Sequence, residues 1–325
     1  MNKFKNFLKE NYYLLFAVIH TFLTFFTDKY IFELDKINET NYYSAKIVLF
    51  IILILFYNFL NKLIIKKNKN TKEYFKYFLI YFVPVFIILL LAWPGVWFGS
   101  DVINFYNHTK VAEFLYFLHY LTSLFYILGY MLFPCASGAI ILQIILFSAI
   151  ISYIIKNMKD IFKSNLVYLF YIPFFIFHTI FYVLFANRPV MFGITYLLLI
   201  AIFTIDKLNK TNINNKKLFL IAFITAIVAN WRSETIYLII AIPLFIFALF
   251  HLQPISLSCG KKQRHRAPAF YFFFPLKLPL TSPRTLRDNF SEIQSYFMAI
   301  SVVRLLICGA KLKKTLILGG VGDSA

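Results

Sequence analysis

Asp101 lies in the most polar segment of a very apolar chain. Residues 93–101 read WPGVWFGSD and directly follow an apolar run. Further polar side chains come next: Asn104, Asn107, His108, Lys110 and Glu113. A carboxylate a few residues beyond a membrane helix stays ionised at the membrane surface, where it can accept a proton or hold a cation. Asp101 is therefore a candidate general base, and the alternative is a solvated acid that caps the next helix.

His119 is the second candidate for acid–base chemistry. It follows Asp101 by 18 residues and sits inside the apolar, aromatic stretch Phe114–Phe133. A single histidine in such surroundings is usually a hydrogen-bonded packing residue. It becomes a catalytic candidate if the fold brings it back over Asp101.

Arg232 and Glu234 interrupt the apolar runs between residues 218 and 250. Charged groups at membrane depth are costly, so they line a polar cavity or pair with each other. An arginine can hold a phosphate through two parallel hydrogen bonds. Arg188 lies in another short turn expected on the same side, and two arginines facing one cleft would suit a phosphate or pyrophosphate. The alternative is that Arg232 and Glu234 cap a helical hairpin at the surface.

Other kinds of chemistry lack support in the sequence. There is no glycine-rich phosphate loop, no HExxH pattern and no nucleophile elbow, so nucleotide-driven chemistry is not indicated. Cys135, Cys259 and Cys308 lack a paired metal spacing, which argues against a zinc site or a disulfide framework. The cofactor is unknown. A divalent cation beside Asp101 is compatible with the sequence but not required by it.

The composition places these residues in a membrane protein. Of the 325 residues, 60% are apolar and 14% are charged, and the mean hydropathy is +0.72. A soluble domain cannot bury that much apolar surface. The net charge of +19 comes largely from lysines in short loops, which form no continuous basic face for nucleic acid. We therefore predict an all-α polytopic integral membrane protein that binds no nucleic acid.

About eight transmembrane helices are expected. The first apolar run follows three lysines and precedes no small-residue cleavage site, so it is interpreted as a retained span. The last two predicted spans, 218–230 and 235–250, are short for a crossing of ~20 residues. Each is therefore either a full crossing or a half-helix. The predicted spans lie near residues 12–27, 43–65, 77–98, 136–155, 166–186, 189–205, 218–230 and 235–250.

The stretch Phe114–Phe133 has the length of a span, but the distribution of charge argues that it does not cross. If this stretch does not cross the membrane, five basic segments that carry 19 Lys and Arg lie together on the inner side. The outer side, which then includes Phe114–Phe133, carries only five Lys and Arg. If it crosses, 11 of those 19 charges move outside, against the positive-inside tendency. We therefore predict a juxtamembrane helix on the outer face and a cytoplasmic N-terminus. An ordinary span in a differently paired topology is the alternative.

The chain divides by composition near residue 251. Residues 1–251 contain 19 asparagines and two arginines, whereas residues 252–325 contain one asparagine and five arginines. The first part is the predicted membrane domain, with an outer loop at 98–135 of the kind that holds catalytic residues. The second part is a basic tail of altered composition, which is either genuine or the product of a lost reading frame.

Several of these motifs resemble the multi-spanning GT-C glycosyltransferases, in particular bacterial membrane families related to dolichyl-phosphate-mannose mannosyltransferases. The resemblance covers roughly residues 77–250. Its elements are Pro94-Gly95, Gly99-Ser100-Asp101, the outer helix with His119, Leu142-Gln143, the turn and helix start at 187–193, and the segment 232–237.

The resemblance implies a transferase that uses a polyprenyl-phosphate-linked sugar and a glycan, lipid or protein acceptor. Asp101 matches the aspartate that acts as base or orients the acceptor, and juxtamembrane helices in that loop are a family feature. The expected enzyme acts on the outer face of the inner membrane, with Arg232, Arg188 and Glu234 as substrate- or phosphate-binding residues.

This chain also departs from the family pattern. Related sequences often have a His-Pro pair where this chain has His119-Tyr120, and an acidic residue where it has Arg188-Pro189. The alternatives are therefore a transporter or flippase for a lipid-linked or anionic substrate, and an inactive truncated fragment.

Overall fold

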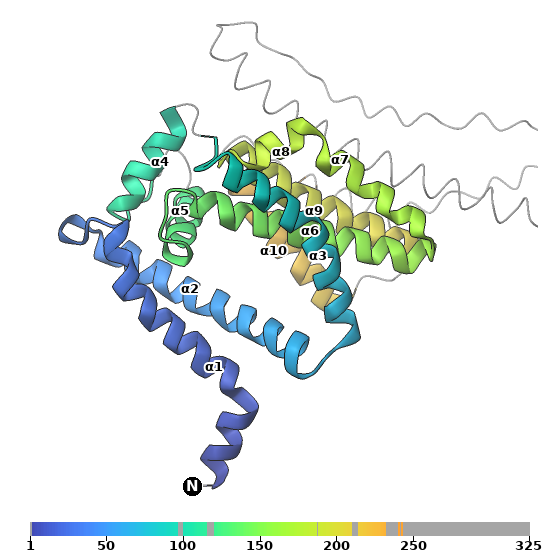
Figure 1. Cartoon of the computed structure of the whole chain (residues 1–325), viewed down its shortest axis with the longest axis horizontal. Coiled ribbons are helices and arrows are strands. Elements are labelled where there is room, and N and C mark those ends of the chain that lie inside the picture. Colours follow the sequence, from blue (N-terminus) through green and yellow to red (C-terminus); the bar gives the residue numbers. More distant parts are fainter. Residues whose placement is uncertain are drawn as a thin grey trace, which may run out of the picture.

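The computed structural model describes residues 2–96, 100–115, 120–186, 188–209 and 214–231, together with residues 240 and 242. Throughout these ranges the secondary structure is helical, without a strand (Figure 1). Four of the described helices are long and apolar enough to cross a membrane. The prediction of a helical membrane protein is thus confirmed at the level of its class, whereas eight crossings are not.

The four candidate spans coincide with four of the predicted ones. They are α2 (Glu39–Leu60) continued by the π-helical turn η3 (Asn61–Ile65), α3 (Lys69–Leu91), α6 (Gly138–Phe162) and α9 (Arg188–Asn209). The prediction for the second of these extended to residue 98, but the helix ends at Leu91. The chain turns over residues 92–94 and continues into Gly95, whose φ of +100° no helix can contain.

The other predicted crossings have different forms. The run 166–186 is a bent pair, in which Asn165–Phe175 and Phe177–Val183 meet at 67°. It consists of η5 (Asn165–Tyr171), α7 (Ile172–Phe175) and α8 (Phe177–Val183), and counting it as one span gives five. Helix α1 (Asn2–Thr27) is kinked at Asn11, and α10 (Asn215–Ala229) has 15 residues. Apart from residues 240 and 242, the predicted span 235–250 lies outside the described residues.

Asparagine side chains begin three of these helices. Asn38, Asn68 and Asn214 precede α2, α3 and α10, and each accepts a hydrogen bond from the backbone N–H three residues later. This satisfies one of the free amide groups of the first turn. The abundance of asparagine in the loops therefore has a local structural consequence.

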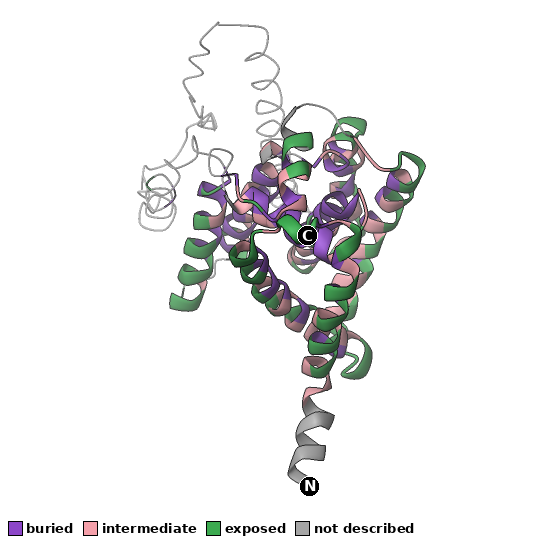
Figure 2. Ribbon diagram, turned by 90° about the vertical axis from the view of Figure 1, so that its left-hand side faces the viewer, coloured by how far each residue is buried: buried purple, intermediate pink, exposed green. Residues whose placement is uncertain are grey.

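Helix α6 is the centre of the bundle. It packs against α3, α5 (Tyr120–Leu132) and α9. In the most apolar 18-residue stretch of α6, 78% of the residues are buried by protein. In the equivalent stretches of α2 and of α3, 22% are buried. Figure 2 shows the buried residues gathered inside the bundle and the exposed ones on its outside. The outward faces of α2 and α3 are therefore the ones available to lipid.

Segments that the charge argument assigns to the outer side lie together at one end. The backbone amides of Glu33 and Asn38 donate to the carbonyls of Lys110 and Val111, at 2.8 Å each. These bonds join the loop containing η1 (Asp28–Tyr30) and η2 (Leu34–Lys36) to the end of α4 (Ser100–Lys110).

The opposite end gathers the segments assigned to the inner side. The hydroxyl of Tyr12 donates a hydrogen bond to the side-chain oxygen of Asn61 at 2.6 Å. The side-chain amide of Asn157, near the end of α6, donates to the hydroxyl of Tyr74 of α3 at 3.4 Å. Helix α10 lies beside α9 there. These contacts thus join segments that the charge argument assigns to the same side.

Helix α5 differs from the candidate spans in length and direction. It has 13 residues, hence a length of ~20 Å, which is less than the ~30 Å of a hydrocarbon core. Figure 1 shows it between the α1–α2 pair and α6, viewed close to its own axis while α6 and α9 run across the picture. Its described side chains are buried or partly buried on all sides, so protein surrounds it.

Candidate functional site

The structure places the backbone of two predicted site residues. Asp101 is the second residue of α4, and Arg188 is the first residue of α9. Their side chains lie outside the described part of the structure, as do His119, Arg232 and Glu234 entirely. The site must therefore be built from the described segments that lead into these residues.

Tyr126 of α5 connects the segments that lead to Asp101 and Arg188. Its hydroxyl donates to the backbone carbonyl of Ala186, two residues before Arg188. Its ring stacks on Phe105 of α4 with a centroid separation of 5.1 Å, and Phe105 follows Asp101 by about one helical turn. Two segments that are far apart in the chain, around Phe105 and Ala186, thus contact one side chain.

The segment that leads to Arg232 reaches the neighbouring residue of α5. The ring of Trp231 packs edge-to-face on Phe125 at 5.9 Å between centroids, and both side chains are buried. Since Arg232 follows Trp231 directly, three segments that precede or contain predicted site residues meet α5 at Phe125 and Tyr126. The structure does not describe His119, so its predicted place near Asp101 is untested.

The turn before Arg188 is fixed by a second side chain. The Nε2 of Gln143 donates to the carbonyls of Val183 at 2.8 Å and Phe185 at 3.2 Å. Gln143 is fully buried on α6, where its amide group supplies donors to the end of the bent pair. In the sequence it appeared only as part of a short motif, and its role as a backbone anchor follows from the structure.

The Pro94-Gly95 motif attaches the end of α3 to the same turn. The hydroxyl of Ser137 donates to the carbonyl of Pro94 at 2.8 Å, and the amide of Val96 donates to the carbonyl of Leu184 at 3.0 Å. A Cβ atom on Gly95 would lie 2.6 Å from Ile140 and 3.1 Å from the carbonyl oxygen of Leu184. Glycine is required here both by this close approach and by its positive φ.

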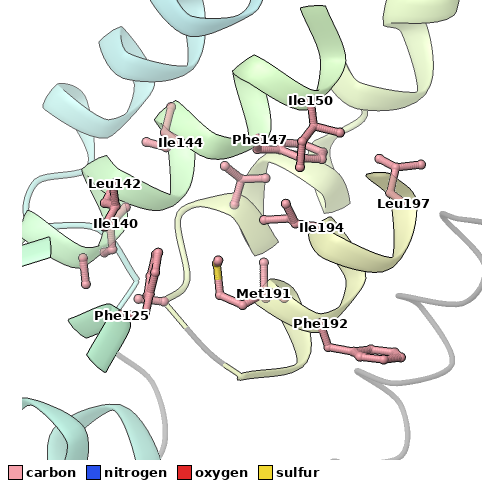
Figure 3. Close-up of a cluster of buried hydrophobic side chains, with 14 of the residues drawn as sticks. Phe125, Ile140, Leu142, Ile144, Phe147, Ile150, Met191, Phe192, Ile194 and Leu197 are labelled. Carbon is pink, nitrogen blue, oxygen red and sulfur yellow. The ribbon is translucent and has the colours of Figure 1, made fainter. Parts of the chain in front are cut away.

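The region around Phe125 continues into an apolar core. Figure 3 shows Phe125 of α5, Ile140 and Leu142 of α6, and Met191 and Ile194 of α9 in one buried cluster. This packing holds α5, α6 and the first turns of α9 together. The first residue of α9, Arg188, thus begins a helix whose first turns are fixed.

A histidine–carboxylate pair is present in the outer segment, but not the pair that the sequence analysis selected. The Nδ1 of His108, near the end of α4, lies 2.7 Å from Oε2 of Glu113. Both side chains are partly exposed. Sequence reasoning placed both residues in the polar cluster around Asp101 but did not pair them, because the turn after α4 brings them together.

A buried ion pair near the outer end was not predicted. Lys46 of α2 lies 2.5 Å from Oδ2 of Asp28, and the same oxygen accepts the hydroxyl of Tyr42. Lys46 also donates to Thr24 of α1 at 2.7 Å. A lysine inside an otherwise apolar span was the available signal, since such a group needs a partner. The pair fixes the start of the loop that bonds to the end of α4.

Cation binding and thiol chemistry find no support in the described residues. Within those ranges no three His, Cys, Asp or Glu side chains are grouped so that they could hold a metal ion. Cys135 has a free thiol whose pKa is raised by burial, which disfavours the reactive thiolate. A divalent cation at Asp101 stays a prediction, because that side chain is not described.

Comparisons with known proteins found no match to this chain among family models, curated proteins or solved structures.

Proposed function

We propose that this protein is a GT-C-like glycosyltransferase of the inner membrane, with a cytoplasmic N-terminus and its site on the outer face. It would transfer a sugar from a polyprenyl-phosphate donor to a glycan, lipid or protein acceptor. The observation that supports this most is the meeting of three segments at Phe125 and Tyr126 of α5. Asp101, Arg188 and Arg232 lie in or directly after those segments.

The chemistry assigned to these residues is a displacement at the anomeric carbon of the sugar. Asp101 accepts the proton of the acceptor hydroxyl as its oxygen forms the new glycosidic bond. The bond between the anomeric carbon and the phosphate oxygen breaks, and the polyprenyl phosphate leaves with that electron pair. Arg232 and Arg188 stabilise the negative charge on the phosphate, Glu234 orients Arg232, and His119 lines the site.

The proposal includes a juxtamembrane position for α5. A helix of 13 residues that is surrounded by protein can lie at the outer surface of the hydrocarbon core without crossing it. Both of its neighbouring segments support this: α4 ends at the loop between α1 and α2, and Ser137 bonds Pro94 at the end of α3. In this position α5 would form the floor of the site.

The test is transfer of radiolabelled sugar from synthetic short-chain polyprenyl-phosphate hexoses in membranes that contain the protein. Asp101→Asn should abolish transfer while the amount of inserted protein is unchanged. Asp35→Asn is the matched control, since Asp35 is an exposed acid in the first outer loop, and it should retain activity. Full activity in Asp101→Asn would contradict the base assignment, and no transfer by the wild type from any hexose donor would contradict the proposed function.

A transporter or flippase is the second candidate, and the bent pair 165–183 favours it. Transporters often use interrupted helices, and here two helical segments meet at 67°. This candidate predicts movement of a fluorescent anionic lipid across a vesicle membrane with no sugar transferred. The glycosyltransferase predicts the reverse.

A further inference from the structure

The end of the bundle opposite the candidate site has an excess of exposed lysines. Among the residues of this end whose side chains the structure describes, the acidic ones are Glu73, Asp160 and Asp206. Asp160 pairs with Lys156 and Asp206 pairs with Lys217, so two of these three acids are already neutralised by a lysine. The following lysines are exposed there: Lys62, Lys66, Lys67, Lys69, Lys72, Lys76, Lys163, Lys207 and Lys216.

One part of this end combines lysines with aromatic rings. The Nζ of Lys159 lies 5.8 Å from the ring centroid of Tyr77 and 5.9 Å from that of Tyr168. The two rings contact each other at 6.0 Å, so Lys159 of α6, Tyr77 of α3 and Tyr168 of η5 form one cluster. Lysine and tyrosine together are typical of the headgroup level of a membrane.

Exposed aliphatic side chains adjoin these lysines. Leu166 and Leu169 of η5 are 68% and 58% exposed, and they lie on either side of Tyr168 along the chain. Lys163 directly follows the last residue of α6 and precedes Leu166 by three residues. A surface with cations at one level and exposed leucines beside them fits a ligand that has an anionic head and an apolar tail.

We propose that Lys159 and Lys163, with Tyr168, Leu166 and Leu169, form a binding surface for an anionic phospholipid at the inner end. The lysines bind the phosphate, and the leucines contact the acyl chains. Near-surface lysines each strengthen binding to anionic lipid, and their effects combine. This surface is independent of the proposed glycosyltransferase site, which lies at the other end of the bundle.

The experiment counts lipids that stay bound to the purified full chain by native mass spectrometry, with phosphatidylglycerol and phosphatidylcholine offered together. Wild-type protein should retain phosphatidylglycerol preferentially. The double variant Lys159→Gln/Lys163→Gln should bind it about tenfold more weakly or worse, as expected when two surface lysines are lost. The matched control is Lys66→Gln/Lys67→Gln, which removes the same charge from an exposed loop at the same end and should change little.

Two further measurements keep the proposal falsifiable. Leu166→Gln should also lower phosphatidylglycerol retention, and glycerol 3-phosphate should not compete at equal concentration, because it lacks acyl chains. An equal loss in both lysine pairs would mean diffuse charge attraction, and effective competition by glycerol 3-phosphate would mean a site for a soluble phosphate. Either result would overturn the proposed lipid-binding surface. Sugar transfer should be unchanged in all of these variants, so this test is separate from that of the proposed function.

Discussion

Tyr126 illustrates how a single side chain can order two distant parts of this protein. Its hydroxyl holds the carbonyl of Ala186, while its ring supports Phe105. Phenylalanine at this position would keep the stacked ring but lose the hydrogen bond. The turn before Arg188 would still keep its hydrogen bonds from Gln143 and Val96.

Tyr126→Phe should therefore destabilise the protein by about 1 kcal/mol, the usual net value of one such bond, and also reduce sugar transfer. The matched control is Tyr81→Phe, because the buried hydroxyl of Tyr81 donates to the carbonyl of Phe174 in a different part of the bundle. The unfolding temperature should fall by a similar amount in both variants, whereas sugar transfer should fall only in Tyr126→Phe. Equal activity of the two variants would argue against a positioning role for Tyr126.

The ion pair between Asp28 and Lys46 provides a second prediction at this scale. Both side chains are at most 5% exposed, so the charge of one depends on the other. Asp28→Asn should cost about 3–5 kcal/mol, since it leaves the ammonium group buried without its counter-charge. Adding Lys46→Met should restore most of that loss in a thermal unfolding assay. A single variant as stable as the wild type would contradict the burial of this pair.

Most of the candidate site residues could be proposed from the sequence, but the side chains that hold their segments in place could not. Asp101 and the arginines stand out because charged residues are rare in an apolar chain. Tyr126 and Phe125 do not, since they are two among 22 tyrosines and 41 phenylalanines. Lys46 was recognisable as a lysine within a span, yet its partner Asp28 becomes apparent only when α1 and α2 are packed together.

Close contact between α5 and α6 determines how the helices meet beneath the candidate site. A Cβ atom on Gly129 of α5 would lie 2.6 Å from the Cα of Ala139 and 2.9 Å from its amide nitrogen. These are backbone atoms and cannot rotate away. The two helices can approach this closely only with glycine at position 129.

Gly129→Ala should therefore destabilise the protein by about 1–3 kcal/mol, the cost typical of overpacking, and should reduce transfer as α5 moves. Gly193→Ala is the matched control, since Gly193 is a partly exposed helix residue where alanine is neutral or stabilising. The two variants are compared by their unfolding temperatures in the same detergent. A Gly129→Ala protein as stable as the control would contradict the close contact.

The sequence predicted the positions of several helices better than their lengths and bends. Phe114–Phe133 is largely apolar, so hydropathy cannot show that residues 114 and 115 lie outside a helix. Charge counting uses the whole chain, and its prediction that this stretch does not cross the membrane stays a prediction. The bend at Ile176 was also hidden, because the run around it is apolar and Pro173 lies in the first turn of α7, where proline is tolerated.

At the scale of the whole molecule, the two ends of the bundle have different chemistry. One end holds the segments that lead to Asp101, Arg188 and Arg232, and the other holds most of the exposed lysines. This division requires that α5 does not cross the membrane. If α5 crossed, Lys110 and Asn157 would lie on the same side, whereas with α5 juxtamembrane only α6 separates them and they lie on opposite sides.

The most direct test is labelling of single cysteines at Lys110 and Asn157, in a cysteine-free background, with a maleimide that does not cross membranes. Intact cells should label position 110, and position 157 should react only after the membrane is opened. Ser100 and Asn212 serve as further probes, expected to label from outside and from inside. Labelling of position 157 in intact cells would show that α5 crosses, which would contradict a single outer-face site built around it.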